Sequence, residues 1–282
     1  MAGLLSGLAG LGLDQFADVN IFDDADGVDG ANAPRITEAS EKDFLYEKSM
    51  ECPVCGKMLT TKIVKSGKNK LLGTDQDFRP RYEGLDVVKY DVILCSHCGY
   101  AGLSRYFMLI APGQGKMIRD NISKSVKLNT YSNENYSYDE ALERYRLALA
   151  CAIVKKAKAS EKAYICLKSA WLVRGYAENI NQNEEDKVKE LKALEEEYLA
   201  NAFSGFAEAR RTESFPMCGM DAGTIDLLLA VLTYELKRFD VSSKLVANLL
   251  VSSANPKTKE KARELKEQLM LELKKQTKQE NQ

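Results

Sequence analysis

Two short cysteine motifs place the strongest constraint on how this chain can fold. CPVCG occupies residues 52–56, and CSHCG occupies residues 95–99. Each motif can place two thiolates on one tight turn, here called a knuckle. The glycine after the second cysteine lets the backbone bend until amide N–H groups point at sulfur. Two knuckles supply four soft ligands, so we predict one tetrahedral metal site with the ligands Cys52, Cys55, Cys95 and Cys98.

Zn²⁺ is the metal that this ligand set favours. A site closed by four thiolates has no open position for water or substrate, so the predicted role of the zinc is structural. The β-branched run VVKYDVILC, residues 87–95, predicts a strand that leads into the second knuckle, as in a zinc ribbon. Iron in a rubredoxin-type site is the alternative. A redox-active dithiol would need a strand and a helix around the CPVC motif, and the pattern there indicates no such unit.

The chain offers few residues for catalysis. Its only histidine, His97, lies inside the second knuckle, where we expect it to be exposed. No histidine therefore remains for a Ser–His or Cys–His nucleophile. The stretch APGQGKM, residues 111–117, lacks the spacing and the hydroxyl of a phosphate-binding loop. We predict no catalytic residues and a protein that is not an enzyme.

Three regions differ in pattern along the chain. Residues 1–45 are rich in Gly, Ala and Asp and predict a flexible, acidic N-terminal segment. Residues 46–125 contain the strand-like runs and predict a zinc-ribbon domain, with residues 66–84 inserted at its tip. Residues 126–282 show helical periodicity, with one face formed by Leu142, Tyr145, Leu149 and Ile153, and predict about six helices. The predicted fold class is α+β, mostly α, with a small zinc-ribbon β head followed by a helical array.

A spaced triplet of small, aromatic and small residues recurs in the helical part. It occurs as Ala141, Tyr145 and Ala148, as Ala202, Phe206 and Ala209, and more weakly as Ser243, Ala247 and Leu250. This spacing resembles the second helix of a tetratricopeptide repeat (TPR), in which small residues let the next helix approach. The distance between triplets exceeds the ~34 residues of the standard repeat. We predict a TPR-like array, and a simple all-α bundle is the alternative.

Composition limits the cellular setting. The 282 residues carry a net charge of -1, with 45% apolar and 29% charged residues, as in ordinary globular domains. No apolar run reaches the ~20 residues of a membrane span. The N-terminus lacks the basic region and the cleavage site of a signal peptide. Paired cysteines that bind metal fit a reducing compartment, so we predict a cytoplasmic protein.

A basic run beside the first knuckle raises an alternative function. The run consists of Lys57, Lys62, Lys65, Lys68 and Lys70. With Arg79, Arg81 and Tyr82 nearby, a ribbon of this kind can lie against a nucleic acid. Acidic residues dilute the patch, namely Asp75, Asp77, Glu83 and Asp86. An enzyme, the third hypothesis, would need a polar cleft around Asp75, Asp77, Arg79 and Tyr82.

Four segments in a fixed order resemble one bacterial family. They read CPVCGK, DQDFRPRYEG, YDVILCSHCGYAGLSRYF and SAWLVRGY, and the resemblance extends from about residue 48 to 253. The family is that of domain of unknown function 2225; its second knuckle commonly has proline where this chain has Ser96. The resemblance implies a zinc-ribbon head and a helical-repeat body, but it implies no activity. Our leading hypothesis is a zinc-binding cytoplasmic scaffold that binds a protein or peptide partner through its helices.

Overall fold

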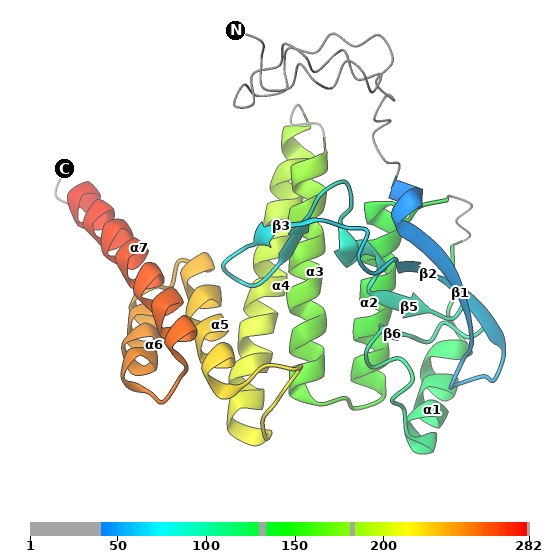
Figure 1. Ribbon diagram of the computed structural model, residues 1–282. Helices are drawn as coiled ribbons and strands as arrows, with labels where there is room; N and C mark the ends of the chain where they lie inside the picture. The colour runs from blue at the N-terminus through cyan, green and yellow to red at the C-terminus, as the bar shows by residue number, and fades with distance from the viewer. Residues whose placement is uncertain (1–40, 130–133, 181–183, 281–282) are drawn as a thin grey trace, which may run out of the picture. The chain divides into compact units, whose positions relative to one another are not determined.

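A computed structural model describes residues 41–129, 134–180 and 184–280, which belong to one compact unit (Figure 1). Most of the predicted N-terminal segment, residues 1–45, lies outside these ranges. Strands occupy the first part of the described chain, and helices occupy the rest. The fold is mostly α with a small β part, as the sequence predicts.

The strands form three antiparallel hairpins. These are β1 (Leu45–Glu51) with β2 (Met58–Val64), β3 (Leu71–Thr74) with β4 (Pro80–Tyr82), and β5 (Val92–Leu94) with β6 (Ala101–Leu103). The first and third hairpins each carry a knuckle at their turn, and the second lies between them in sequence. The strand expected over residues 87–95 is shorter, because Val87–Tyr90 forms a 3₁₀ helix. Asp86 caps this helix: its Oδ1 accepts a hydrogen bond from the Val88 amide, at 3.1 Å.

The helices follow the strands. They are α1 (Pro112–Ile118), α2 (Tyr138–Val154), α3 (Ala159–Asn179), α4 (Glu185–Thr212), α5 (Ala222–Glu235), α6 (Phe239–Val251) and α7 (Pro256–Glu280). A π-helical turn, Arg119–Ser123, continues α1. Six of these helices begin after residue 137, which agrees with the predicted number. Ser137 caps α2, since its side chain accepts a hydrogen bond from the Glu140 amide, at 3.1 Å.

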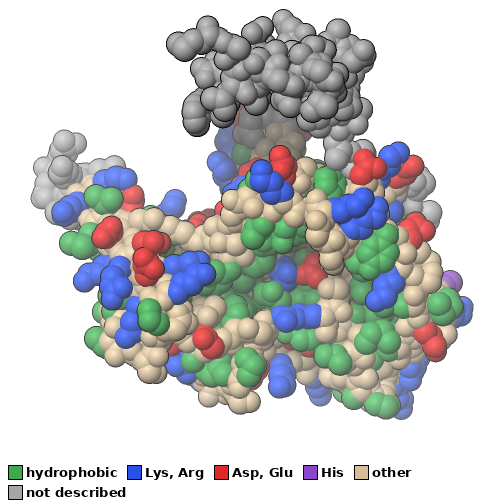
Figure 2. All heavy atoms as spheres, viewed as in Figure 1, with side chains coloured by type: hydrophobic (Ala, Val, Ile, Leu, Met, Phe, Trp, Pro, Cys, Tyr) green, Lys and Arg blue, Asp and Glu red, His purple; other side chains and the backbone are tan. Residues whose placement is uncertain are grey.

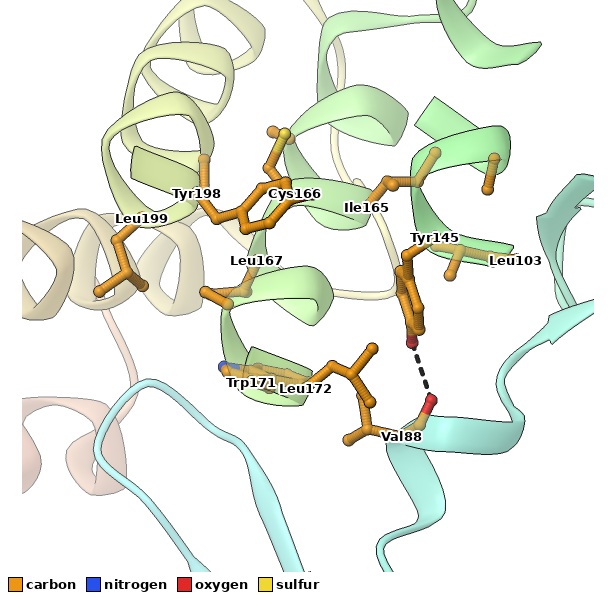
Figure 3. Close-up of a cluster of buried hydrophobic side chains, with 14 of the residues drawn as sticks. Val88, Leu103, Tyr145, Ile165, Cys166, Leu167, Trp171, Leu172, Tyr198 and Leu199 are labelled. Carbon is orange, nitrogen blue, oxygen red and sulfur yellow. Dashed lines mark hydrogen bonds between the residues drawn. The ribbon is translucent and has the colours of Figure 1, made fainter. Parts of the chain in front are cut away.

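Consecutive helices pack against one another from α2 to α7. The apolar core between α2, α3 and α4 includes Tyr145, Ile165, Leu172 and Leu199, all of them buried (Figure 3). Two predicted triplets are buried completely or almost so: Ala141, Tyr145 and Ala148 on α2, and Ala202, Phe206 and Ala209 on α4. The third lies nearer the surface, because Ala247 on α6 is exposed. Small residues thus lie at two close helix contacts.

The core is continuous across the domain boundary predicted at residue 125. Val88, Val92, Ala101 and Leu103 share one apolar cluster with α2 to α5. The Tyr145 hydroxyl donates a hydrogen bond to the Val88 carbonyl oxygen, at 3.1 Å, which ties α2 to the 3₁₀ helix (Figure 3). The boundaries themselves stay a prediction, but this cluster joins strands and helices across residue 125. A smaller cluster of Leu45, Leu85, Tyr90 and Tyr136 contains no residue of α1 to α7.

Among the described residues, no helix is both long enough and apolar enough to cross a membrane. The longest, α4 with 28 residues and α7 with 25, carry charged side chains along their length. The expectation of no membrane-spanning helix is therefore confirmed for this part of the chain.

Candidate metal centre

The two knuckles bring all four predicted ligands together. The Sγ atoms of Cys52, Cys55, Cys95 and Cys98 lie within 4.8 Å of one another and form what we call the cysteine cluster. Two of the distances between knuckles, Cys52 to Cys98 and Cys55 to Cys95, are 3.7 Å. Metal–sulfur bonds of about 2.3 Å in a tetrahedron give edges of about 3.8 Å, whereas a disulfide needs about 2.05 Å. The cluster is therefore compatible with a metal site, and its cysteines are free thiols.

Each knuckle is a turn that closes on itself. The amide of Gly56 donates to the carbonyl of Cys52, and the amide of Gly99 donates to the carbonyl of Cys95, both at 2.9 Å. Both glycines have left-handed backbones, with φ of 71° and 73°, which residues with a side chain rarely adopt. At Gly99 a Cβ atom would also lie 2.6 Å from Val126 Cγ1. The glycine predicted to permit the turn is thus required for it.

Backbone amides face the sulfurs of the first cysteine in each knuckle. Hydrogen bonds from Cys55 and Val54 lower the pKa of Cys52, and those from His97 and Cys98 lower the pKa of Cys95. The neighbouring thiols have a larger effect. Cys52 and Cys98 lower the pKa of Cys95, whereas Cys95 contributes most to raising the pKa of Cys52 to about 11. Four thiols this close cannot all ionise without a cation, and a metal ion bound among them would supply that charge.

The cluster is set into the helical part of the molecule. Its cysteines share a buried apolar cluster with Tyr100, Phe107 and Ile118 of the chain that follows, and with Cys151 on α2. The Cys151 thiol donates to the Gly99 carbonyl at 3.7 Å and accepts from the Ala101 amide at 3.4 Å. A helix therefore braces the second knuckle directly.

The remaining candidates do not join the cluster. His97 is exposed, and its Nε2 donates to the Met58 carbonyl, at 3.0 Å. Of the basic run, Lys62 lies 4.9 Å from the centre of the Tyr136 ring, Lys65 donates to a backbone carbonyl, and Lys70 pairs with Glu83. Three of the five lysines thus contact other parts of the chain.

A second polar site lies between the knuckles, and sequence reasoning missed its structure. The acidic and basic residues of the segment DQDFRPR dock onto α3 and α4 in what we call the charge network. Its members are Asp75, Asp77, Arg79, Arg81, Asp86, Arg174, Glu178 and Glu195. The sequence shows that acidic and basic residues are concentrated in this segment. It does not show which helical residues they contact.

Asp77 is the centre of the network. It is fully buried, and its Oδ2 accepts a hydrogen bond from Trp171 Nε1, at 2.9 Å. The same oxygen lies 3.0 Å from Arg174 Nη2, and Arg174 also contacts Asp75 and Glu195. Trp171 is buried and donates this hydrogen bond from α3 to the loop.

The basic residues of the segment contact α3 at Glu178, one helical turn after Arg174. Arg79 Nη1 and Arg81 Nη2 contact the two carboxylate oxygens of Glu178, at 3.0 and 2.8 Å. Burial favours the neutral form of Asp75, but the hydrogen bond from Arg81 and the nearby guanidinium charges outweigh it and lower the pKa of Asp75. The network therefore consists of charged partners, most of them shielded from water.

A polar cavity of about 460 Å³ lies beside this network. Arg79, Arg81, Tyr82 and Asp86 line it together with Tyr138. Its cations already have carboxylate partners, since Arg79 pairs with Asp86 and Glu178, and Arg81 with Asp75 and Glu178. Of the four residues around which the enzyme hypothesis requires a cleft, Arg79 and Tyr82 line this cavity, whereas Asp75 and Asp77 do not. The charged side chains of the cavity hold the segment in place.

Comparison with known proteins gives one match. A search of curated proteins and a search of solved structures found no similar protein. The sequence profile of a family described as uncharacterized protein conserved in bacteria (DUF2225) matches residues 45–269, which include both knuckles, the charge network and most of the helices. The chain therefore belongs to this bacterial family.

Proposed function

We propose that the cysteine cluster binds one structural Zn²⁺. Cys52, Cys55, Cys95 and Cys98 would supply all four ligands, so the metal would hold the two hairpins together and would have no position for a substrate. The spacing of the sulfurs and the backbone amides that face them support this proposal. Iron in the same ligand set is the alternative, because both metals accept four thiolates in a tetrahedron.

We further propose that the protein is a cytoplasmic scaffold or adaptor whose TPR-like helical array binds a protein or peptide partner. One observation carries this proposal: consecutive helices from α2 to α7 stack in sequence order, with small residues at the contacts of α2 and α4. Arrays of this kind expose an extended surface to which a partner segment binds. The cluster, buried against α2, would stabilise that surface and not act on a substrate.

Affinity purification tests the scaffold role. The full chain, loaded with zinc and carrying an affinity tag, would be incubated with a nuclease-treated bacterial lysate. We expect it to retain one or a few proteins in near-stoichiometric amount. We expect the variant Cys98→Ser, which lacks one metal ligand, to lose them together with the metal. Elemental analysis of the purified chain should give about one zinc, and iron in its place would decide for the alternative metal.

The same experiment has two contradicting outcomes. Retention of no protein in stoichiometric amount would contradict the scaffold role. Binding of nucleic acid before nuclease treatment, weakened in the variants Lys57→Glu and Lys68→Glu, would instead favour the nucleic-acid hypothesis.

A further inference from the structure

A second cavity lies where the segment between the knuckles reaches the C-terminal helices. It has a volume of about 220 Å³. Its walls come from the backbone and side chains of Thr74, Asp75 and Gln76, and from α5 and α7. Leu227, Val231 and Leu265 are its apolar residues, and all three are buried. Pockets for drug-sized ligands span roughly 300–1,000 Å³, so this cavity is on the scale of one large side chain.

The helix that forms one wall is basic at its N-terminal end. Five cationic residues, against three glutamates, lie between residues 256 and 268: Lys257, Lys259, Lys261, Arg263 and Lys266. In the part of the chain that the structure describes, none of these five forms an ion pair within 4.0 Å; the one such pair on α7 is that of Lys275. Basic side chains are visible over α6 and α7 in Figure 2, with acidic side chains among them. The surface around the cavity is therefore complementary to an acidic partner.

The rim of the cavity carries charges of both signs. Lys261 and Glu264 project from α7, and Asp75 projects from the loop. The carboxylate of Asp75 is already bound by Arg81 and Arg174, at 2.5 and 3.3 Å, so it repels an acidic ligand only weakly. Glu264 is the remaining acid, one helical turn from Lys261.

The chain itself shows what chemistry this surface accepts. Next to the cavity, Phe78 packs against the apolar cluster formed by α5, α6 and α7, and the Lys261 ammonium lies 5.1 Å from the centre of its ring. Gln76 Nε2 donates to Gln268 Oε1, at 2.8 Å. The loop thus already places one aromatic and one amide side chain against the C-terminal helices, whereas the carboxylates of Asp75 and Asp77 bind arginines of the charge network.

We propose that this cavity is the anchor pocket for an acidic peptide segment of a protein partner. One leucine- or phenylalanine-sized side chain of the partner enters the pocket between Gln76 and α7, and flanking carboxylates face Lys261 and the other cations of α7. Such interfaces concentrate their binding energy in one buried apolar anchor, while charged neighbours set specificity and association rate. The proposal rests on the scaffold function above and assigns its binding site.

A peptide library displayed on phage tests the pocket while the natural partner is still unidentified. The probe is a library of random twelve-residue peptides, selected on the zinc-loaded full chain. We expect enrichment of peptides that carry a net negative charge and one leucine or aromatic residue at a fixed position. An enriched peptide, synthesised with a fluorophore, should lose most of its affinity when that residue is replaced by glycine.

Two variants locate the peptide on the protein. Gln76 is exposed at the mouth of the cavity, so Gln76→Trp should fill it without altering the core, and should weaken binding by roughly tenfold or more. Lys261→Glu should also weaken binding, and more strongly at low salt. Gln76→Ala, which removes the bond to Gln268 but fills nothing, should bind as the wild type does. Lys158→Glu, on an exposed lysine at the start of α3, is the matched charge control.

Several results would overturn the proposal. They are selection of basic peptides, selection of none, and equal affinity of the enriched peptide for the wild type and for Gln76→Trp. Its failure is distinguishable from failure of the scaffold role. If Gln76→Trp still retains the lysate partner in full amount, the scaffold function stands and its binding site lies elsewhere.

Discussion

The segment between the two knuckles is held in two different ways, at its ends and at its middle. At the ends, the cysteine cluster joins four identical side chains that come from two local motifs. At the middle, the charge network joins unlike side chains, and Asp77 and Arg174 lie 97 positions apart in the chain. Both sites are built from groups that are unfavourable alone: thiolates that repel one another, and charges withdrawn from water.

The two sites differ in the source of the positive charge that offsets the unfavourable groups. The thiolates need an external cation, so their stability depends on metal concentration. The carboxylates of the network have their own guanidinium partners, so their stability depends on the folded chain alone. Burying an ion pair contributes little net stability, but breaking one leaves an unpaired charge and is strongly destabilising. We expect the two sites to respond differently to perturbation.

Removal of the metal should have the largest effect. Structural zinc contributes roughly 10–16 kcal/mol of apparent binding free energy in small peptides, as much as the whole stability of a typical domain. Because Cys151 on α2 shares the core of the cluster, chelation should lower the melting temperature of the whole described unit and not of the hairpins alone. Thermal unfolding followed by helical circular dichroism, with and without chelator, measures this.

A helical unfolding transition that chelation leaves unchanged would contradict this expectation. That outcome would mean that the strands fold separately from the helices, as the predicted domain boundary at residue 125 implies. Re-addition of zinc to the chelated chain is the control for damage by the chelator.

Loss of Asp77 should have the next largest effect. The variant Asp77→Ala removes one of the three carboxylates that contact Arg174 and leaves the buried Trp171 N–H without its acceptor. We expect the free energy of unfolding to fall by about 3 kcal/mol in urea titrations, because a buried donor is left unsatisfied and one charged contact is lost. Lys189→Ala breaks a pair whose side chains are 72% and 80% exposed, and it should change stability by less than about 0.5 kcal/mol. The metal content of Asp77→Ala should stay at the wild-type value. This result would show that the charge network and the cysteine cluster contribute to stability independently.

A methyl group at Gly175 tests how closely the network packs on α3. A Cβ atom there would overlap Asp86 Oδ2 and lie 2.8 Å from Arg79 Nη2. Alanine is the better helix former, yet we expect Gly175→Ala to destabilise the protein by about 1–3 kcal/mol, because the loop must move away. Gly113→Ala on α1, where no atom lies within 4 Å of the added Cβ, should be tolerated in the same denaturation assay.

Glu235 at the edge of the network should give the smallest effect. Burial raises the pKa of Glu235. The positive charge of Arg174 lowers it by a smaller amount, so the pKa remains raised. A raised pKa means that the folded state binds the proton more tightly, so this residue favours folding below its unfolded pKa and loses that contribution as pH rises. Glu235→Gln should therefore become more stable relative to the wild type as pH increases from about 4 to 7. A stability difference that does not change with pH would contradict this account.

The sequence predicts those parts of the molecule that depend on neighbours along the chain. The four cysteines lie together as predicted, and the glycine of each knuckle has the left-handed backbone that its turn requires. Helical periodicity was less precise: Ile153, placed on one face with Leu142 and Tyr145, is 60% exposed near the end of α2, whereas those two are buried. The 3₁₀ helix at Val87–Tyr90 was missed, since β-branched residues favour a strand and only the Asp86 cap indicates otherwise.

The charge network could not be predicted, for a physical reason. Asp77, Arg79 and Arg81 look like an exposed polar loop until the partners on α3 are known, and those partners lie more than 90 residues away. Gly175 within SAWLVRGY was the one visible signal, because glycine inside a helix weakens it unless another part of the chain approaches closely. The sequence contained that signal but not the identity of the approaching segment.

The closed segment between the knuckles also bears on the order in which the protein is made. A ribosome synthesises residues 52–98 before it reaches α3 at residue 159, so the four thiols can capture their metal while the helices do not yet exist. Metal capture would convert the intervening residues into a ring. The polar residues at the middle of that ring would then be in place before α3 is synthesised. The helix would pack against them as it leaves the ribosome. Metal supply during synthesis would thus decide where α3 packs.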